Sequence, residues 1–392
     1  MNQVIQYNFP TIIRYGYQVR SELPKAIKDM GFNRPLVVTD RELASLPMAE
    51  EIKNYLTNAG LYSKVFSGTY GNPLKSHANL GANEYRVHNA DCIVAFGGGA
   101  PIDVAKCIAV LVSHKGDLFE YEDRAGAKPI EISQLPSIFS IPTTAGTGSE
   151  VGRSAVVSDD ATKVKRIIFS PGLLPKMVFL DPELTLKLPA SITASTGMDA
   201  LTHLIEAYLS KGFQPLCDGI ALEGIGIVSQ SLKKCVEFAK ANEYSPSEEH
   251  IEARGLMLNA ATMGGVAFQK GLGACHSAAH ALSTVCDMHH GLANGILLPY
   301  IMEFNMSTSK EKFKRMAEAA GLGSKSPKSF IQWLEDLKAE IGIPKYLSEA
   351  NVQKSHIDDL VKIAIQDVCH PFNPRSVSEE DFREIFTKAI GE

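Results

Sequence analysis

The apolar residues in the first part of the chain form short continuous runs, each followed by a polar or glycine-rich turn. Such runs are typical of strands buried on both faces of a parallel sheet. The runs predict strands at residues 36–39, 63–69, 92–96 and 138–141. Apolar side chains at helical spacing predict helices at residues 22–30, 74–89 and 102–112. This alternation of strands and helices predicts an α/β domain with a mostly parallel sheet.

The pattern changes near residue 185 to helical periodicity with few strand-like runs. Pro182 and Pro189 punctuate the change. We therefore predict two domains, an α/β domain at residues 1–185 and an all-helical domain at residues 186–392. Thr196 is predicted to begin a helix of the second domain.

Composition narrows the class of protein. The chain has 392 residues, 45% of them hydrophobic and 21% charged, as in a globular protein with a large core. A net charge of −5 gives no electrostatic reason to expect nucleic acid or an anionic membrane as a partner, which favours small molecules. The seven cysteines lack any Cys-x-x-Cys pair, and neither a signal peptide nor a long apolar run is present. We expect a cytoplasmic protein.

The segment from Gly271 to Gly295 contains four of the eleven histidines in the chain. His276 and His280 stand four apart in a helical pattern, and His289 and His290 follow. A buried imidazole needs partners for both ring nitrogens, and a metal ion supplies one. Any single histidine of the four is more simply explained as solvated or satisfied in the core.

Asp199 and His203 lie four apart on one face of the predicted upstream helix. They could merely bond to each other, but with two of the later histidines they complete a four-ligand site of nitrogen and oxygen atoms. Such a site suits Fe(II), Zn(II) or a similar divalent ion. The residues alone leave open which two histidines take part and which ion is bound.

Two turns in the first domain suggest a nucleotide site. Gly97, Gly98 and Gly99 stand between a strand and a helix, where backbone N–H groups can approach a diphosphate, although the spacing is not G-x-G-x-x-G. A second turn, rich in Thr, Gly and Ser, follows the strand at 138–141. Asp40 ends another strand and could accept hydrogen bonds from a ribose or cap the next helix.

Four segments together resemble one family. They are GGGAPIDVAK, IPTTAGTGSEV, TGMDALTHLIEA, and CHSAAHAL with HHGLANGILLPY. In this order they resemble the iron-containing (group III) alcohol dehydrogenases, and the similarity continues to the NPR at residues 373–375. The resemblance implies a dinucleotide-binding α/β domain, a helical domain, and the architecture shared with dehydroquinate synthase.

The resemblance also implies roles for individual residues. The metal ligands would be Asp199, His203, His276 and His290. His280 would be a catalytic residue near the nicotinamide, and His289 lies outside the ligand set. The implied cofactor-binding residues are Asp40, Asn72, Gly97, Gly98, Gly99, Asp103, Thr143, Thr144, Thr147 and Lys165. A carboxylate at Asp40 favours NAD(H) over NADP(H), since it would repel a 2′-phosphate.

The implied substrate pocket departs from the family pattern. Gly152, Ser154 and Ala267 are small where relatives often have bulkier residues, and Cys369 lies in the same expected region. Nearby polar or basic candidates for binding an anionic or hydroxylated substrate tail are Arg153, Gln269, Lys270, Cys369 and His370. The alternative is that Arg153 and Lys270 are structural or face outward. Ala100 replaces the serine usual after the glycine turn.

The implied reaction is hydride transfer between a small primary alcohol, or its aldehyde, and NAD(H), with the metal binding the alkoxide or carbonyl oxygen. One alternative is a dehydrogenase for ω-hydroxy acids or other anionic alcohols. A more remote alternative is an NAD- and metal-dependent lyase of the dehydroquinate-synthase type. The family also suggests a homodimer or a larger homo-oligomer.

Overall fold

The computed structural model describes residues 6–9, 11–241 and 246–391, which fall into two compact units. The α/β unit consists of Pro10–Thr144 and Gly148–Thr185. The helical unit contains Leu186–Glu392 together with Met1–Phe9 and Ala145–Thr147. Among the described residues we find no helix whose length and apolarity would let it span a bilayer.

The centre of the α/β unit is a six-stranded sheet in the order β1-β8-β5-β4-β2-β3. Every neighbouring pair in it is parallel, which confirms the predicted fold class. The strands are β1 (Ile12–Tyr15), β2 (Pro35–Asp40), β3 (Lys64–Thr69), β4 (Cys92–Gly97), β5 (Ser137–Pro142) and β8 (Met177–Leu180).

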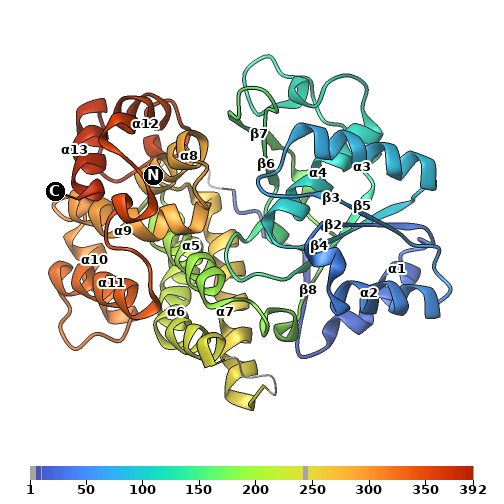
Figure 1. Ribbon diagram of the computed structural model, residues 1–392, viewed down its shortest axis with the longest axis horizontal. Coiled ribbons are helices and arrows are strands. Elements are labelled where there is room, and N and C mark those ends of the chain that lie inside the picture. Colours follow the sequence, from blue (N-terminus) through green and yellow to red (C-terminus); the bar gives the residue numbers. More distant parts are fainter. Residues whose placement is uncertain (1–5, 10, 242–245, 392) are drawn as a thin grey trace. The chain divides into compact units, whose positions relative to one another are not determined.

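Helices cover both faces of this sheet (Figure 1). Val37 and Val94 pack in one apolar cluster with α1 (Leu23–Asp29) and α2 (Pro47–Asn58). Their neighbours Leu36 and Ile93 point the other way, into a cluster with α3 (Lys75–His88) and α4 (Gly99–Ser113). Because successive side chains alternate between two buried faces, the central residues of these strands are apolar.

A second, two-stranded antiparallel sheet was not predicted. It pairs β6 (Ser154–Ser158) with β7 (Lys165–Phe169), in a region where the sequence predicted no strand. The hairpin is joined to α4 through Asp103, whose Oδ2 accepts a 3.0 Å hydrogen bond from the Val156 N–H. Two five-residue strands depend on this tertiary contact, which sequence periodicity does not reveal.

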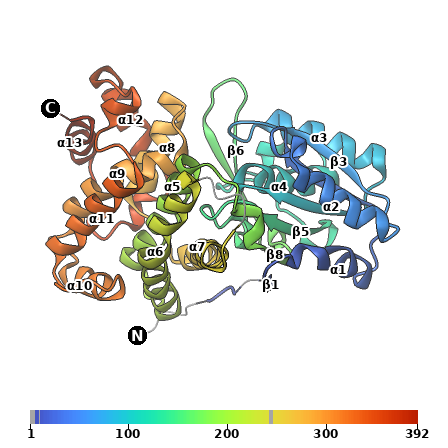
Figure 2. The same cartoon turned by 60° about the horizontal axis from the view of Figure 1, so that its bottom comes forward.

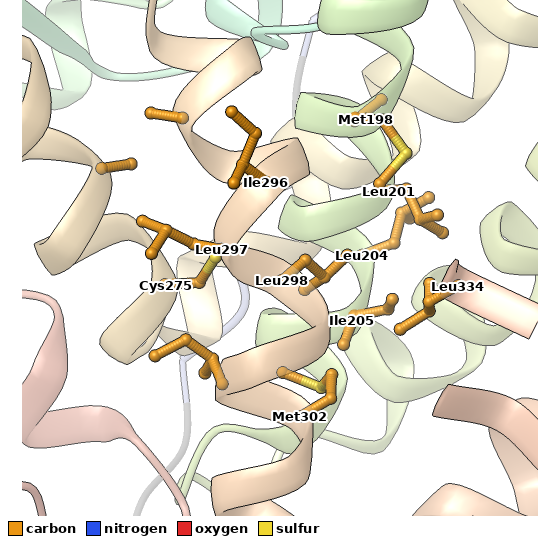
Figure 3. Packing of buried hydrophobic residues seen from close by; sticks show 14 of the residues in the cluster. Met198, Leu201, Leu204, Ile205, Cys275, Ile296, Leu297, Leu298, Met302 and Leu334 are labelled. Carbon is orange, nitrogen blue, oxygen red and sulfur yellow. The ribbon is translucent and has the colours of Figure 1, made fainter. Parts of the chain in front are cut away.

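The helical unit is built around α5 (Ala190–Leu209), which packs against α6 (Pro215–Ala241), α7 (Glu248–Ala267) and α9 (His290–Asn305) (Figure 2). Apolar side chains of α5 such as Leu204 and Ile205 lie beside Leu298 and Met302 of α9 in the core (Figure 3). The other helices are α8 (Ala274–Cys286), α10 (Lys310–Ala319), α11 (Pro327–Ile341), α12 (Ile357–Ala364) and α13 (Glu379–Ile390).

The predicted start of α5 at Thr196 is wrong, since the helix begins at Ala190. The Thr196 hydroxyl does not cap the helix but donates to the carbonyl oxygen of Ile192, 2.8 Å away, one turn earlier. Asp199 and His203 consequently lie in the interior of a long helix, where both are almost fully buried.

Candidate functional site

The four predicted metal ligands come together inside the helical unit. Potential ligand atoms of Asp199, His203 and His276 all lie within 4.8 Å of one another. Nε2 of His290, at the start of α9, is 3.5 Å from Oδ1 of Asp199, and Nε2 of His276 is 3.9 Å from the same oxygen. Three helices, α5, α8 and α9, thus bring one carboxylate and three imidazoles to one place.

The state of these side chains fits a divalent ion. Burial lowers the pKa of His203 to about 4, so the ring is neutral near pH 7 and keeps a lone pair. Its Nδ1 is buried without a hydrogen-bond partner among the described residues. A buried polar atom left without a partner costs about 1–3 kcal/mol. A metal ion held by the nitrogen and oxygen donors of this set would offset such a cost.

Glu206, which sequence reasoning missed, orients one of these ligands. Its Oε2 lies 2.7 Å from Nδ1 of His276, so Nε2 of that ring faces Asp199. The same carboxylate accepts the backbone N–H groups of Gly273, Cys275 and His276 at the beginning of α8. Glu206 therefore fixes both the helix end and the imidazole. It stands seven residues after Asp199 on the same helical face, a signal that the sequence does contain.

Asn294 is a second unpredicted neighbour of the ligand set. It lies one turn after His290 on α9 and is fully buried. Its amide nitrogen donates to Oδ1 of Asp199 at 2.8 Å and lies 3.2 Å from Nε2 of His290. The amide holds the Asp199 carboxylate in place.

The other two histidines of the cluster have different surroundings. The ring of His280 stacks on that of His290, with centroids 5.2 Å apart, and its Nδ1 lies 2.7 Å from Oδ2 of Asp367. His289 precedes α9, and its Nδ1 accepts the N–H of Leu292 as a helix cap. The position of His289 thus has a structural explanation.

Most of the predicted cofactor residues lie at one edge of the large sheet. Asp40 ends β2, Gly97 ends β4, Thr143 follows β5, and Asn72 lies in the turn after β3. These four strands are adjacent in the order β3-β2-β4-β5. In the sheet, β3 lies on one side of β2 and β4 lies on the other, so the order of the strands reverses at β2. Folds of the α/β class bind ligands beyond the carboxyl ends of the strands at such a reversal.

The glycine turn has little room for side chains. Gly97 has a φ of 145°, and a Cβ there would be 2.5 Å from Cγ of Pro101. Gly98 is the N-cap of α4, and Gly99 is its first residue. The hydroxyl oxygen of Thr144 lies 3.3 Å from where a Cβ on Gly98 would stand. The N-terminus of a long helix beside side-chain-free backbone is suited to a diphosphate.

Other predicted cofactor residues have different positions. Asp103 is fastened within its own unit, because its oxygens accept the hydroxyl of Ser149 at 2.5 Å and the N–H of Val156 at 3.0 Å. These bonds give Asp103 a structural role beside the hairpin, and its predicted role toward the cofactor stays a prediction. Thr147 belongs to the helical unit, and Lys165 is the half-buried first residue of β7.

The predicted substrate-pocket residues are divided between the two units. Gly152 and Ser154 flank a fully buried lysine, Lys106, whose Nζ donates to the Ser154 carbonyl at 2.7 Å and would lie 3.6 Å from a Cβ on Gly152. Ala267 is fully buried in the helical core. Cys369 donates its backbone N–H to Asp367 and so lies beside His280.

The polar and basic candidates are mostly engaged inside the structure. Nζ of Lys270 lies 2.5 Å from Oδ1 of Asp218, and its side chain is fully buried. The guanidinium of Arg153 lies over the ring of Phe169, 5.3 Å from its centroid. Gln269 accepts the N–H of Asn8, and Nε2 of His370 contacts the carbonyl oxygen of Ile365.

Comparison with known families covers nearly the whole chain. Residues 10–182 match the model of the iron-containing alcohol dehydrogenases, and residues 193–390 match the C-terminal model of the same family. The chain belongs to the iron-containing alcohol dehydrogenase family. The sequence resemblance is thereby confirmed.

Relatives of this family align along almost their full length. The chain is 34% identical to 1,3-propanediol dehydrogenase of Citrobacter freundii, with 99% of each chain covered. It is also 34% identical to NAD-dependent methanol dehydrogenase of Bacillus methanolicus, over 94% of this chain and 95% of the relative. A crystal structure of 1,3-propanediol oxidoreductase superposes with a TM-score of 0.92 at 33% identity, covering 99% of this chain and 100% of the other.

The contacts of Glu206 lead to a first prediction. Glu206→Gln keeps the side-chain volume but leaves one oxygen to accept bonds from the α8 N-terminus and His276. We expect the affinity for Fe(II) or Zn(II) to fall by about 10- to 100-fold, as for other losses of a group that orients a ligand. Competition with a chelator measures this, with Glu223→Gln on the exposed face of α6 as a control. Unchanged affinity would contradict the assigned role.

Proposed function

We propose that this chain is an NAD(H)-dependent alcohol dehydrogenase that uses a divalent metal, iron in the first place, to interconvert small primary alcohols and aldehydes. The observation that carries the proposal is the meeting of Asp199, His203, His276 and His290 inside the helical unit. Membership of the iron-containing family and the NAD-dependent methanol dehydrogenase among its relatives support the choice of metal and cofactor.

In this proposal the four side chains hold the ion, and Glu206 and Asn294 keep two of them in position. A bound ion would supply Lewis-acid polarisation of an alcohol or carbonyl oxygen, and a bound nicotinamide would accept or supply the hydride. The glycine turn and the N-terminus of α4 bind the diphosphate, while Thr143 and Thr144 line it and Asp40 receives the adenosine ribose. His280, beside the metal ligands, is the proposed catalytic residue for proton transfer.

The test is formation of NADH by protein loaded anaerobically with Fe(II), and separately with Zn(II), on addition of NAD and either methanol or 1,3-propanediol. We expect NADH to accumulate and a chelator to abolish the activity. A lyase of the dehydroquinate-synthase type would complete its cycle without net NADH. Failure of every alcohol and aldehyde in a broad screen would refute the proposed function.

Asp40 provides a prediction about the cofactor. Its Oδ1 accepts the N–H of Leu43 at 2.7 Å, and a carboxylate has further acceptor capacity for a ribose. Asp40→Asn keeps an oxygen for this cap but removes the charge. We expect the ratio of kcat/KM for NAD to that for NADP to fall by about tenfold, which corresponds to 1.4 kcal/mol. An unchanged ratio would contradict the proposed contact with ribose.

The contacts of Lys270 argue against this residue as the anion site of the ω-hydroxy acid alternative, but a 4-hydroxybutyrate dehydrogenase of Cupriavidus necator, 33% identical over 97% of this chain, supports that alternative. The Lys270 ammonium is paired with Asp218 and also donates to the carbonyl oxygen of Tyr208 at 3.0 Å. Binding a substrate carboxylate there would require breaking a buried ion pair, which is costly. Comparison of kcat/KM for a plain alkanol and for its carboxylated analogue decides between the two substrate classes.

The proposal places the enzyme in the cytoplasm as a homodimer or a larger homo-oligomer. All seven cysteines are free, and six of them are buried, which is consistent with a reducing compartment. Light scattering coupled to size exclusion tests the oligomeric state.

A further inference from the structure

A network of hydrogen bonds beside the proposed metal ligands centres on Asp367. Its Oδ2 lies 2.7 Å from Nδ1 of His280. Its Oδ1 accepts the hydroxyl of Ser277 at 2.7 Å and the backbone N–H of Cys369 at 2.9 Å. The two oxygens therefore have different partners, one imidazole on one side and two donors on the other.

Contacts of Ser277 and His280 with other residues hold these two partners of Asp367 in place. Ser277 and His280 lie three apart on α8, so both face the segment that carries Asp367. The Ser277 oxygen accepts the backbone N–H of His370 at 2.8 Å, which leaves its own hydrogen for Asp367. Stacking on His290 restricts the plane of the His280 ring.

The direction of each bond follows from the charge of Asp367. Burial opposes ionisation, but His280, the Cys369 N–H and the Ser277 hydroxyl together hold the pKa of Asp367 well below its ordinary value. An ionised carboxylate only accepts hydrogen bonds, so the proton between the two side chains belongs to Nδ1 of His280. In a neutral imidazole the other nitrogen, Nε2, then carries the lone pair.

We propose that Asp367 is a positioning residue, which holds His280 in the tautomer with the proton on Nδ1 and so presents Nε2 as a hydrogen-bond acceptor. The arrangement corresponds to the role of an aspartate behind a catalytic histidine in hydrolases, where the carboxylate sets orientation and tautomer. The consequence for turnover rests on the proposed function of His280, whereas the tautomer itself does not.

Asp367→Asn tests the proposal with no change in volume. Ser277 and Cys369 both offer hydrogens to the Oδ1 position, so the asparagine oxygen is expected there. Its NH₂ group then faces His280 and donates to Nδ1, which moves the ring proton to Nε2. The substitution should therefore invert the tautomer, rather than merely weaken a contact.

The first measurement is nitrogen NMR of metal-free protein with labelled imidazoles, at a pH of about 8 so that ordinary histidines are neutral. The His280 signals are assigned from their loss in His280→Gln. We expect Nδ1–H in the native chain, Nε2–H in Asp367→Asn, and no change in Asp359→Asn on the exposed side of α12. A native Nε2–H tautomer, or one unaffected by Asp367→Asn, overturns the proposal.

The second measurement is kinetic. Asp367→Asn should lower kcat by about 10²-fold or more, a typical contribution of general acid–base catalysis, with unchanged metal content and little change in KM. In a His280→Ala background it should cost nothing further. An equal loss in both backgrounds indicates a purely structural role and overturns the proposal. Potential ligand atoms of His280, Asp367 and Cys369 lie within 4.8 Å of one another, so these three residues could instead hold a second metal ion. Binding of a second ion that is lost in Cys369→Ser would also overturn the proposal. If no alcohol is turned over but the tautomer inverts, the proposed function fails and the positioning role stands.

Discussion

His276→Ala is expected to lose stoichiometric metal and to lower kcat for alcohol oxidation by at least about 10³-fold. Polarisation by a metal contributes several kcal/mol to transition-state stabilisation, and each 1.4 kcal/mol is a factor of ten. Nδ1 of His276 lies 2.7 Å from the Glu206 carboxylate, and Nε2 of the same ring lies 3.9 Å from the Asp199 carboxylate. The ring therefore connects Glu206 to the proposed metal site. Metal analysis and NADH formation measure the two losses.

The fold should survive this substitution. The Glu206 carboxylate retains the backbone N–H groups of Gly273, Cys275 and residue 276, which do not depend on the imidazole. Circular dichroism should therefore match that of the native protein. His88→Ala in the α/β unit is the matched control, because it also removes an imidazole. Among the described residues, the His88 ring has one hydrogen-bond partner, the carbonyl oxygen of Tyr62. Full activity of His276→Ala in metal-free buffer would refute a metal-dependent mechanism.

Local periodicity was sufficient to predict the parallel sheet, the helical second half and the pairing of Asp199 with His203 on one helix. The spacing of four residues fixes which side chains share a helical face. It does not determine whether α8 and α9 approach α5, and the choice of His276 and His290 as ligands came from the family resemblance. Their convergence on Asp199 is a property of helix packing, visible only in three dimensions.

The residues that sequence reasoning missed act through other residues. The position of Glu206, seven residues after Asp199 on the same face of the buried helix α5, is a signal in the sequence, but its contact with α8 is visible only in the fold. Lys106 lies in an apolar helix, and only the fold shows that the carbonyl oxygens of Ser149 and Ser154 surround its ammonium. Asp367 follows His280 by many residues along the chain, and no spacing rule connects them. Tertiary hydrogen bonds of this kind are not encoded in periodicity.

The contact between α9 and α5 leads to the second large prediction, for Gly291→Ala. A Cβ at Gly291 would stand 2.3 Å from the Ser195 carbonyl oxygen and 3.3 Å from Cβ of Asp199. The first of these atoms is backbone within α5, so the two helices must separate. We expect a loss of about 1–3 kcal/mol of stability, the usual cost of overpacking. We also expect weaker metal binding, since the neighbouring His290 moves away from Asp199, its partner at 3.5 Å.

The matched control for this change is Gly219→Ala on α6, where a new Cβ has nothing within 4 Å. There alanine should stabilise by about 0.5–1 kcal/mol, because it only improves helix propensity. Thermal unfolding of both variants with and without metal separates the two effects. Metal should raise the melting temperature of Gly219→Ala as much as that of the native chain, and that of Gly291→Ala much less. Equal increases for both would mean that the distance between α9 and α5 does not control the metal site, and that His290 reaches the ion by another route.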